Sequence, residues 1–158
     1  MKLLGTAKKS LGQNFLVDNN IINKIIKISN INKNPNIAIL GINPHNFSQA
    51  KNSEEKEIIS PAIEAIKKSK IKVMGPISTD TSFTLLKRYK LDVIIGMYHD
   101  QVLSPFKALF GYNAINITLG LPYIRVSPDH GVAENIIGKR IANPKSLIES
   151  IKFFNYIK

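Results

Sequence analysis

His45, His99 and His130 are the residues of this sequence best suited to chemistry. They are its three histidines, and each follows an apolar run that predicts a buried strand. Neutral imidazole is a good ligand for a divalent metal, and loops at one edge of a sheet can bring two such ligands together. A metal there would polarise a substrate hydroxyl or carbonyl during oxidation. Two ligands are few for a tight site, and a lone loop histidine is more often a surface or capping residue, so both interpretations stay open at this point.

A second group, Lys107, Asn116 and Arg125, could hold an anion. Lysine and arginine suit phosphate or carboxylate, and a guanidinium can clamp either group with two hydrogen bonds. Arg125 is the stronger candidate because it follows the apolar residues 119–124. Ordinary surface charge is the alternative interpretation of the group.

Alternating strands and helices must position these residues. Apolar runs predict strands, and amphipathic stretches between and after them predict helices, with Pro61 either kinking its helix or starting a second one after Ser60. This order predicts an α/β fold, a mostly parallel sheet with helices on both faces. Ligands of such sheets bind beyond the carboxyl ends of the strands, where the candidate residues fall. The strands are expected at 37–40, 71–74, 91–97 and 114–119, and the helices at 53–68, 81–89, 101–110, 131–137 and 144–156.

The polar stretch 29–35 divides the chain into two predicted parts. Residues 1–34 form a basic N-terminal segment, in which Asp18 or Asn19 could cap a helix with an apolar isoleucine face over residues 21–28. Residues 35–158 form the α/β domain.

The composition is that of a globular protein with a basic surface. The 158 residues include 22 Lys and Arg against 11 Asp and Glu, a formal net charge of +11. Such charge can serve a nucleic-acid or phosphate partner, but the lysines are scattered, which favours a solvated surface over nucleic-acid binding. No apolar run is long enough for a membrane span or signal peptide. The absence of cysteine excludes disulfides and thiolate metal sites and agrees with a cytoplasmic location.

Two common nucleotide-binding signatures are missing. No Gly-x-Gly-x-x-Gly run follows a predicted strand, and no phosphate-binding P-loop is present. A standard Rossmann site is therefore not expected.

Four ordered motifs nevertheless resemble one enzyme family. They lie at 41–45, 97–101, 116–125 and 129–131, and together with 75–76 and 80–83 they resemble the C-terminal half of the 4-hydroxythreonine-4-phosphate dehydrogenases over residues 35–158. The resemblance implies an NAD-dependent oxidation, with decarboxylation, of the phosphorylated amino acid 4-phosphooxy-L-threonine on the route to pyridoxal phosphate. It also implies a homodimer and a divalent metal (Zn, Mg or Co).

The resemblance further implies roles for individual residues. His45 and His99 match metal-ligand positions, and Lys107, Asn116 and Arg125 match positions that hold the substrate; no catalytic residue is assigned. Residues 130–133, 138–139 and 142–144 also resemble the loop with which isopropylmalate and isocitrate dehydrogenases wrap NAD, which implies an isopropylmalate-dehydrogenase-like half. The cofactor candidates from this loop are His130, Gly131, Ala133 and Asn143.

Two departures from the family limit the functional expectation. The loop after His45 reads Asn46-Phe47-Ser48-Gln49-Ala50 in place of the commoner glycine-rich form. The family's enzymes are also about twice as long, and their other half supplies a further metal histidine, so the chain is expected to be an incomplete fragment that is inactive alone. Residues 8–18 resemble the start of the ribosomal RNA adenine dimethyltransferases, although that family's methionine-binding strand and catalytic motif are absent. An RNA-binding module or a remnant without catalysis is therefore the alternative.

Overall fold

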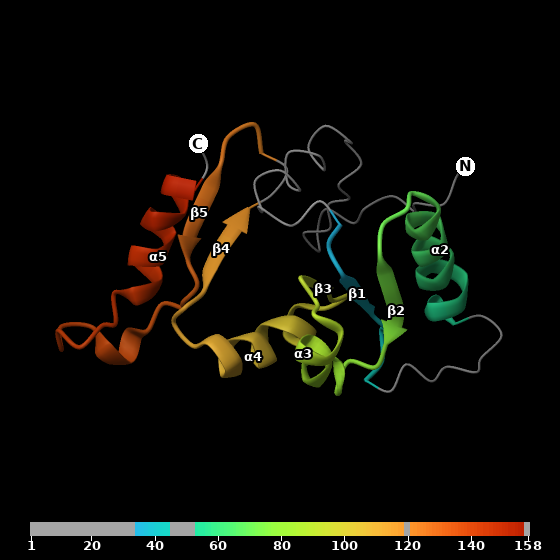
Figure 1. Cartoon of the computed structure of the whole chain (residues 1–158). Coiled ribbons are helices and arrows are strands. Elements are labelled where there is room, and N and C mark those ends of the chain that lie inside the picture. The colour runs from blue at the N-terminus through green and yellow to red at the C-terminus, as the bar shows by residue number, and fades with distance from the viewer. Residues whose placement is uncertain (1–33, 45–52, 119–120, 157–158) are drawn as a thin grey trace. The chain divides into compact units, whose positions relative to one another are not determined.

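The computed structural model describes residues 34–44, 53–118 and 121–156 (Figure 1). The chain divides into two compact units, one of residues 31–114 and one that contains residues 115–158. The described part of the first unit is an α/β arrangement, and that of the second is a β-hairpin with a helix. The predicted N-terminal helix lies outside the described residues, and the predicted domain division at residue 34 stays a prediction.

A three-stranded parallel sheet is the centre of the first unit. Its strands are β1 (Ile37–Leu40), β2 (Val73–Ile77) and β3 (Val93–Ile95), in the order β2-β1-β3 (Figure 1). The predicted α/β class with a parallel sheet is confirmed. The strand at 37–40 has the predicted bounds, whereas β3 is shorter than the predicted 91–97.

The strand β2 differs from the prediction because it runs through Gly75 and Pro76 instead of ending there. The register between β1 and β2 shifts at this point, since Ala38 pairs with Met74 but Leu40 pairs with Ile77. The bulge accommodates a proline, which has no N–H for the ladder. Gly75 has a φ of +144°, and a Cβ built on it would lie 2.5 Å from the carbonyl oxygen of Ile39. Only glycine fits this position without strain.

The hydrophobic core lies between this sheet and the helical segment that precedes β2. The predicted helix 53–68 is confirmed as a π-helical turn, η2 (Glu55–Ile59), that continues into α2 (Ser60–Lys68), with Pro61 in the first turn of α2. Ile59 and Ile63 pack against Ile39 of β1. Burial of each such side chain contributes about 1.5–3 kcal/mol, which fixes the helix on the sheet.

Two further helical segments follow β2 and β3. The predicted helix 81–89 is confirmed as η3 (Ser82–Leu85) and α3 (Leu86–Tyr89). The helix α4 (His99–Phe110) begins two residues before its predicted start at 101. The expectation that His99 lies in a loop is therefore wrong, because this histidine opens the first turn of α4.

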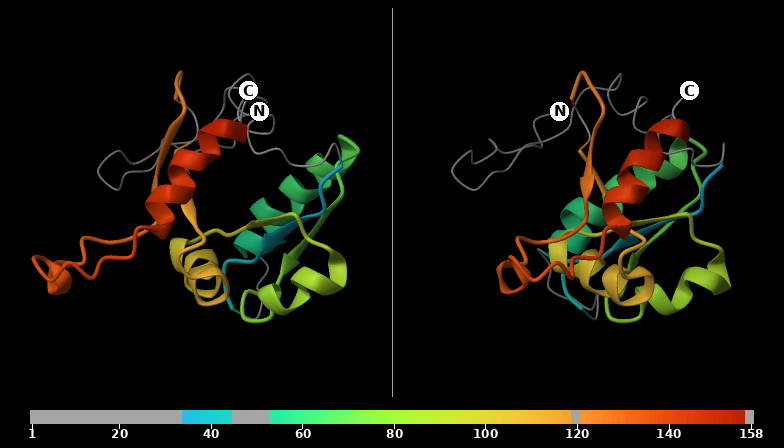
Figure 2. Two further views of the ribbon diagram at one scale, coloured as in Figure 1. Left: turned by 60° about the vertical axis from the view of Figure 1, so that its left-hand side comes forward. Right: turned by 90° about the vertical axis from the view of Figure 1, so that its left-hand side faces the viewer.

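The second unit contains an antiparallel hairpin of β4 (Ile115–Thr118) and β5 (Arg125–Pro128). The strand predicted at 114–119 is confirmed, but it does not join the parallel sheet, and β5 was not predicted. A parallel crossover needs about a dozen or more residues, and the connection from β4 to β5 is shorter, so the strands must pair as a hairpin. The predicted helix 144–156 is confirmed as α5 (Lys145–Phe153) and η5 (Phe154–Tyr156), and α5 runs alongside the hairpin (Figure 2).

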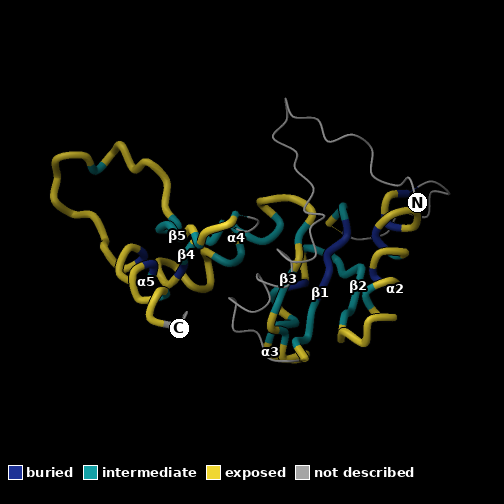
Figure 3. The backbone as a smooth tube through the Cα atoms, turned by 90° about the horizontal axis from the view of Figure 1, so that it is seen from above, coloured by how far each residue is buried: buried dark blue, intermediate teal, exposed yellow. Residues whose placement is uncertain are grey.

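The connection from β5 to α5 is a long exposed loop. The helix predicted over 131–137 is wrong except for one turn, η4 (Glu134–Ile136). Ala133 and Gly138 have φ values of +52° and +76°, which a right-handed helix does not allow. Figure 3 shows most of this loop exposed, and Val132 keeps 82% of its surface accessible. Among the described helices, none is long and apolar enough to cross a membrane.

Candidate functional site

The carboxyl ends of β1, β2 and β3 meet at one edge of the parallel sheet, and two buried or half-buried side chains organise this edge. The first is Glu55, which is 6% exposed. Its Oε1 accepts the backbone N–H groups of Ile42 and Asn43 at 3.1 and 3.4 Å and the side-chain amide of Asn43 at 3.0 Å. The carboxylate therefore fixes the loop that leaves β1.

The second organising side chain is Gln101 of α4. Its Nε2 donates to the carbonyl oxygens of Gly41 and Ile42 at 2.9 and 3.1 Å and lies 3.2 Å from the hydroxyl of Thr79. The backbone of Ile42 is thus held on both sides of its Cα, because Glu55 accepts its N–H and Gln101 donates to its carbonyl. The residues that follow β1 and β2 are joined in this way to α4.

The other half of the Gln101 amide holds the connection from β3 to α4. The side-chain Oε1 accepts the backbone N–H groups of Met97 and Tyr98 at 2.7 and 3.0 Å. The backbone N–H of Gln101 in turn donates to the carbonyl of Tyr98 at 3.2 Å. This reciprocal arrangement is that of a capping residue at the third helical position. It satisfies N–H groups at the start of α4 and explains why the helix begins at His99.

The metal-ligand candidates relate to this edge in different ways. His99 is exposed in the first turn of α4, two residues before Gln101. His45 lies outside the described residues, but Pro44 before it accepts the N–H of Thr79 at 2.9 Å, so the chain that leads to His45 is held at the same edge. Within residues 34–44, 53–118 and 121–156, no three side chains of His, Cys, Asp or Glu gather closely enough to hold a metal ion.

Two of the three substrate candidates come together in the second unit. In the hairpin register, Asn116 pairs with Ser127 and Thr118 pairs with Arg125. Side chains of paired and alternate residues share one face of a sheet, so these four polar residues form one surface, here called the hairpin face. Nη1 of Arg125 donates to Oγ1 of Thr118 at 2.7 Å, which orients the guanidinium on this face.

The opposite face of the hairpin is apolar and belongs to the packing with α5. Ile115, Ile117, Val126 and Pro128 alternate with the polar residues and are partly buried. Buried Ser146 of α5 accepts the backbone N–H of Asp129 at 2.8 Å and so holds the end of β5. Lys107, the third substrate candidate, is exposed on α4 in the first unit and does not belong to the hairpin face.

The cofactor candidates lie along the exposed loop between β5 and α5. Nδ1 of His130 is 3.0 Å from the carbonyl oxygen of Gly131, so the tautomer that donates from Nδ1 leaves Nε2 as an acceptor. Ala133 is in the left-handed conformation before η4. Oδ1 of Asn143 accepts the N–H of Lys145 at 2.9 Å, so this asparagine forms a local turn directly before α5.

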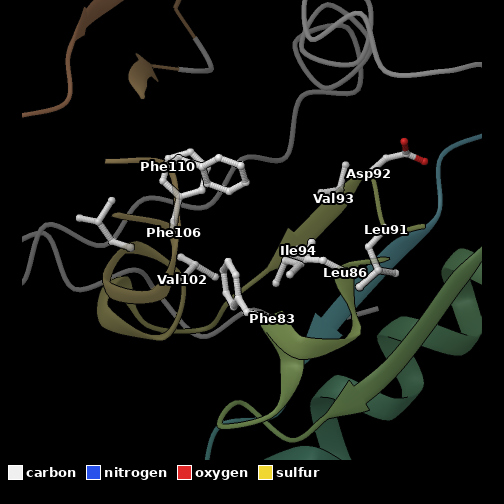
Figure 4. Close-up of a pocket in the computed structure, with 10 residues that line it drawn as sticks. Phe83, Leu86, Leu91, Asp92, Val93, Ile94, Val102, Phe106 and Phe110 are labelled. Carbon is white, nitrogen blue, oxygen red and sulfur yellow. The ribbon is translucent and has the colours of Figure 1, made fainter. Parts of the chain in front are cut away.

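An apolar pocket of about 430 Å³ lies elsewhere in the first unit. It lies between β3, α3 and α4, and Figure 4 shows Phe83, Ile94 and Phe106 among its lining residues. Asp92 directs its carboxylate away from these apolar side chains (Figure 4). None of the predicted site residues lines this pocket.

Sequence reasoning missed the residues that organise the site. The sequence assigns no role to Glu55, and it places Gln101 only in the motif 97–101 and at the start of the helix predicted over 101–110. The spacing of Gln101, three residues after Tyr98 at the start of α4, is the capping signal that could have found it. The contacts of Gln101 with Gly41 and Ile42 have no local sequence signal.

Comparison with known proteins agrees with this α/β architecture. The family model "Pyridoxal phosphate biosynthetic protein PdxA" matches residues 12–154. A 4-hydroxythreonine-4-phosphate dehydrogenase of Sulfurihydrogenibium sp. is 47% identical over 126 residues, which are 78% of this chain and 38% of the relative. A relative from Oceanobacillus iheyensis, which is named as a D-threonate 4-phosphate dehydrogenase, is 45% identical over 121 residues. These residues are 75% of this chain and 36% of the relative.

A solved structure shows the same relationship. The crystal structure of the 4-hydroxythreonine-4-phosphate dehydrogenase from Klebsiella pneumoniae has a TM-score of 0.65 and 35% identity, and the match covers 84% of this chain and 40% of that one. This chain therefore spans about two fifths of the length of these relatives. The family match begins at residue 12, inside the segment that resembles the methyltransferases, and that second resemblance stays a prediction. The match over most of the chain shows that it belongs to the family of the pyridoxal phosphate biosynthetic protein PdxA.

Proposed function

We propose that this chain supplies the metal- and cofactor-binding part of an NAD-dependent 4-hydroxythreonine-4-phosphate dehydrogenase. The observation that carries the proposal is the edge of the parallel sheet, where Gln101 joins the loop that leads to His45 to the turn that carries His99. Family membership and the names of the relatives supply the reaction class. Since the relatives are more than twice as long, turnover is proposed for an assembly in which further residues complete the site, with a homodimer as the expected form.

The proposed substrate is 4-phosphooxy-L-threonine. Its hydroxyl carbon passes a hydride to NAD and its hydroxyl oxygen loses a proton, which leaves a 3-oxo acid that releases carbon dioxide. Arg125 and Asn116, on the hairpin face, and Lys107 of α4 would bind its phosphate and carboxylate groups. Thr118 would keep the guanidinium of Arg125 in place through their hydrogen bond.

The residues at the sheet edge fit a divalent metal in donor chemistry. Neutral imidazoles of His45 and His99 would hold Zn²⁺, Mg²⁺ or Co²⁺ together with ligands from outside the described residues. When bound, the metal would lower the free-energy cost of the charge that develops on the substrate oxygen. The exposed loop with His130, Gly131, Ala133 and Asn143 would bind NAD, and Asn143 would also hold the start of α5 through its hydrogen bond with the N–H of Lys145.

Replacement of His99 by alanine is expected to weaken Zn²⁺ binding by roughly tenfold or more, because one of few imidazole ligands is lost. His130→Ala is the matched variant: it should leave Zn²⁺ affinity within about threefold and weaken NADH binding instead. Calorimetric titration of the full chain with Zn²⁺ and with NADH measures both. Equal Zn²⁺ affinity of the wild-type and His99→Ala chains would remove His99 from the metal site.

Replacement of Arg125 by alanine is expected to weaken the binding of phosphorylated substrates by about tenfold or more, because a bidentate charged contact is lost. Arg88→Ala is the matched control, since that guanidinium stacks on the ring of Tyr89 at 5.5 Å and lies in the other unit. Calorimetry with 4-phosphooxy-L-threonine provides the measurement. If both variants bind the ligand as the wild-type chain does, Arg125 does not hold the phosphate.

A second candidate substrate is D-threonate 4-phosphate, for which one relative is named. It shares the phosphate and carries a hydroxyl at the carbon where 4-phosphooxy-L-threonine carries its amino group. Turnover assays with NAD and Zn²⁺ distinguish the two, because reduction of NAD with one compound alone identifies the substrate. Turnover by the isolated chain with either one would contradict the expectation that the chain needs further residues.

A further inference from the structure

We propose that Gln101 is a positioning residue whose side-chain amide sets the loop after β1 against the first turn of α4, where the metal-ligand candidate His99 lies. The inference deepens the proposed function and rests on it for the metal-ligand role of His99. Gln101 itself is not assigned a contact with metal or substrate. It acts through the backbone of Gly41 and Ile42 on one side and of Met97 and Tyr98 on the other.

The chemistry of these partners fixes the orientation of the amide. Two backbone carbonyl oxygens face Nε2, which can only donate, and two backbone N–H groups face Oε1, which can only accept. A rotation of the amide by 180° would oppose like groups on both sides. The amide therefore works as a two-ended bridge, with its donor end on the loop after β1 and its acceptor end on the loop before α4.

The bridge is supported by close packing around it. A Cβ added to Gly96 would lie 2.8 Å from Cγ1 of Val102 and 3.4 Å from Cβ of Gln101, so the loop before α4 approaches the helix closely. On the other side, Glu55 binds the N–H of Ile42, whose carbonyl Gln101 binds. Both ends of the bridge are thus held by rigid elements, which a metal site needs because its ligands must stay within about 0.5 Å of their positions.

The variant Gln101→Glu tests the donor end of the bridge while it leaves the acceptor end in place. It keeps an acceptor for Met97 and Tyr98 but places a carboxylate oxygen against the carbonyl oxygens of Gly41 and Ile42. Asn36→Asp is the matched control at the opposite edge of the sheet, since Nδ2 of Asn36 donates to the carbonyl of Lys90 at 3.1 Å. Both variants replace an amide donor with a carboxylate oxygen beside a backbone carbonyl.

Amide hydrogen exchange followed by NMR tests the bridge without any metal. In Gln101→Glu, exchange at the amides of Ile42 and Asn43 should rise by roughly tenfold or more, while the amides of Met97 and Tyr98 stay protected. Asn36→Asp should leave the amides of Ile42 and Asn43 unchanged. Unchanged exchange at these amides in Gln101→Glu would overturn the proposal. A uniform rise over the whole sheet would also overturn it, because that pattern reports global destabilisation.

One measurement on the wild-type chain keeps the bridge testable if Gln101→Glu does not fold. The Nε2 protons of Gln101 should exchange at least roughly tenfold more slowly than those of the exposed side-chain amide of Asn113, because a made hydrogen bond must open first. Equal rates for the two side-chain amides would contradict the bridge.

Zn²⁺ titration then connects the bridge to the proposed site. Gln101→Glu is expected to reduce Zn²⁺ affinity by about 10–100-fold, as loss of an outer-shell partner does in metal sites, and Asn36→Asp by less than threefold. Altered exchange with unchanged Zn²⁺ affinity would overturn the link to metal binding. If the wild-type chain binds no Zn²⁺, the proposed function fails and the metal part of this inference fails with it, while exchange still decides whether Gln101 joins the two loops.

Discussion

Replacement of Glu55 by alanine is expected to lower the free energy of unfolding by about 3 kcal/mol, because the loss leaves several N–H groups without their acceptor. Glu55 is 6% exposed, and its carboxylate accepts two backbone N–H groups and one side-chain amide through a single oxygen. The effect should concentrate in the loop after β1, which leads to His45. Urea denaturation of the full chain, followed by far-UV circular dichroism, measures the change.

Two further variants make the Glu55 result specific. Glu57→Ala changes an exposed acidic residue of the same helical turn and should alter the free energy of unfolding by less than about 0.5 kcal/mol. Glu55→Gln keeps an acceptor oxygen and should cost about 1 kcal/mol, intermediate between the other two. A cost for Glu55→Ala that equals the cost of Glu57→Ala would show that the buried carboxylate does not stabilise the loop.

The sequence predicted the elements of the first unit well, because local signals define them. β1 is a short apolar run that follows Asn36 and ends at Gly41, and its bounds were predicted correctly. The amphipathic stretch 53–68 predicted the helix that packs on the sheet, and the structure buries Ile59 and Ile63 on the face that contacts the sheet. Neither result depends on knowledge of distant contacts.

Pairing between strands was harder to predict because it depends on tertiary structure. β5, Arg125–Pro128, is four residues long and includes serine and proline, so Val126 is its one residue with a high strand propensity. Without β5 the sequence could not show that β4 belongs to a hairpin. The hairpin face was therefore not predicted, although the resemblance had named two of its four residues, Asn116 and Arg125.

The helix predicted over 131–137 is wrong for a local reason. Ile137, the last residue of that predicted helix, is 72% exposed, so its side chain does not anchor the segment in a core. The backbone there turns through positive φ at Ala133, Gly138 and Arg140, which breaks helical geometry.

The candidate site divides into residues that the sequence could name and residues that only the fold reveals. His99 and Arg125 are exposed and belong to recognisable motifs, so resemblance reached them. Glu55 and Gln101 act through contacts with residues 12 to 60 positions away, which no periodicity records. Exposed residues can touch a ligand directly, whereas these two hold the backbone that carries ligand contacts.

The bulge of β2 leads to the second large effect, on stability. Gly75→Ala is expected to lower the free energy of unfolding by roughly 3–5 kcal/mol, because it adds a steric clash in the sheet to backbone strain. The new Cβ would lie 2.5 Å from the carbonyl oxygen of Ile39 and 3.1 Å from Cδ1 of Ile63. The carbonyl belongs to the central strand β1 and cannot move without disturbing its pairing with β3. Urea denaturation again provides the measurement.

Gly111→Ala separates the clash at Gly75 from the backbone strain. Gly111 also has a positive φ, +54°, and lies in the same unit, but no atom lies within 4 Å of its added Cβ. Gly111→Ala should therefore lower the free energy of unfolding only by the backbone strain, about 1–3 kcal/mol. The difference between the two losses of unfolding free energy measures how much it costs to push β2 away from β1. This displacement would occur beside the edge that carries the proposed metal ligands. If Gly75→Ala costs no more than Gly111→Ala, the strands have room to separate, and close packing at the bulge does not hold that edge in place.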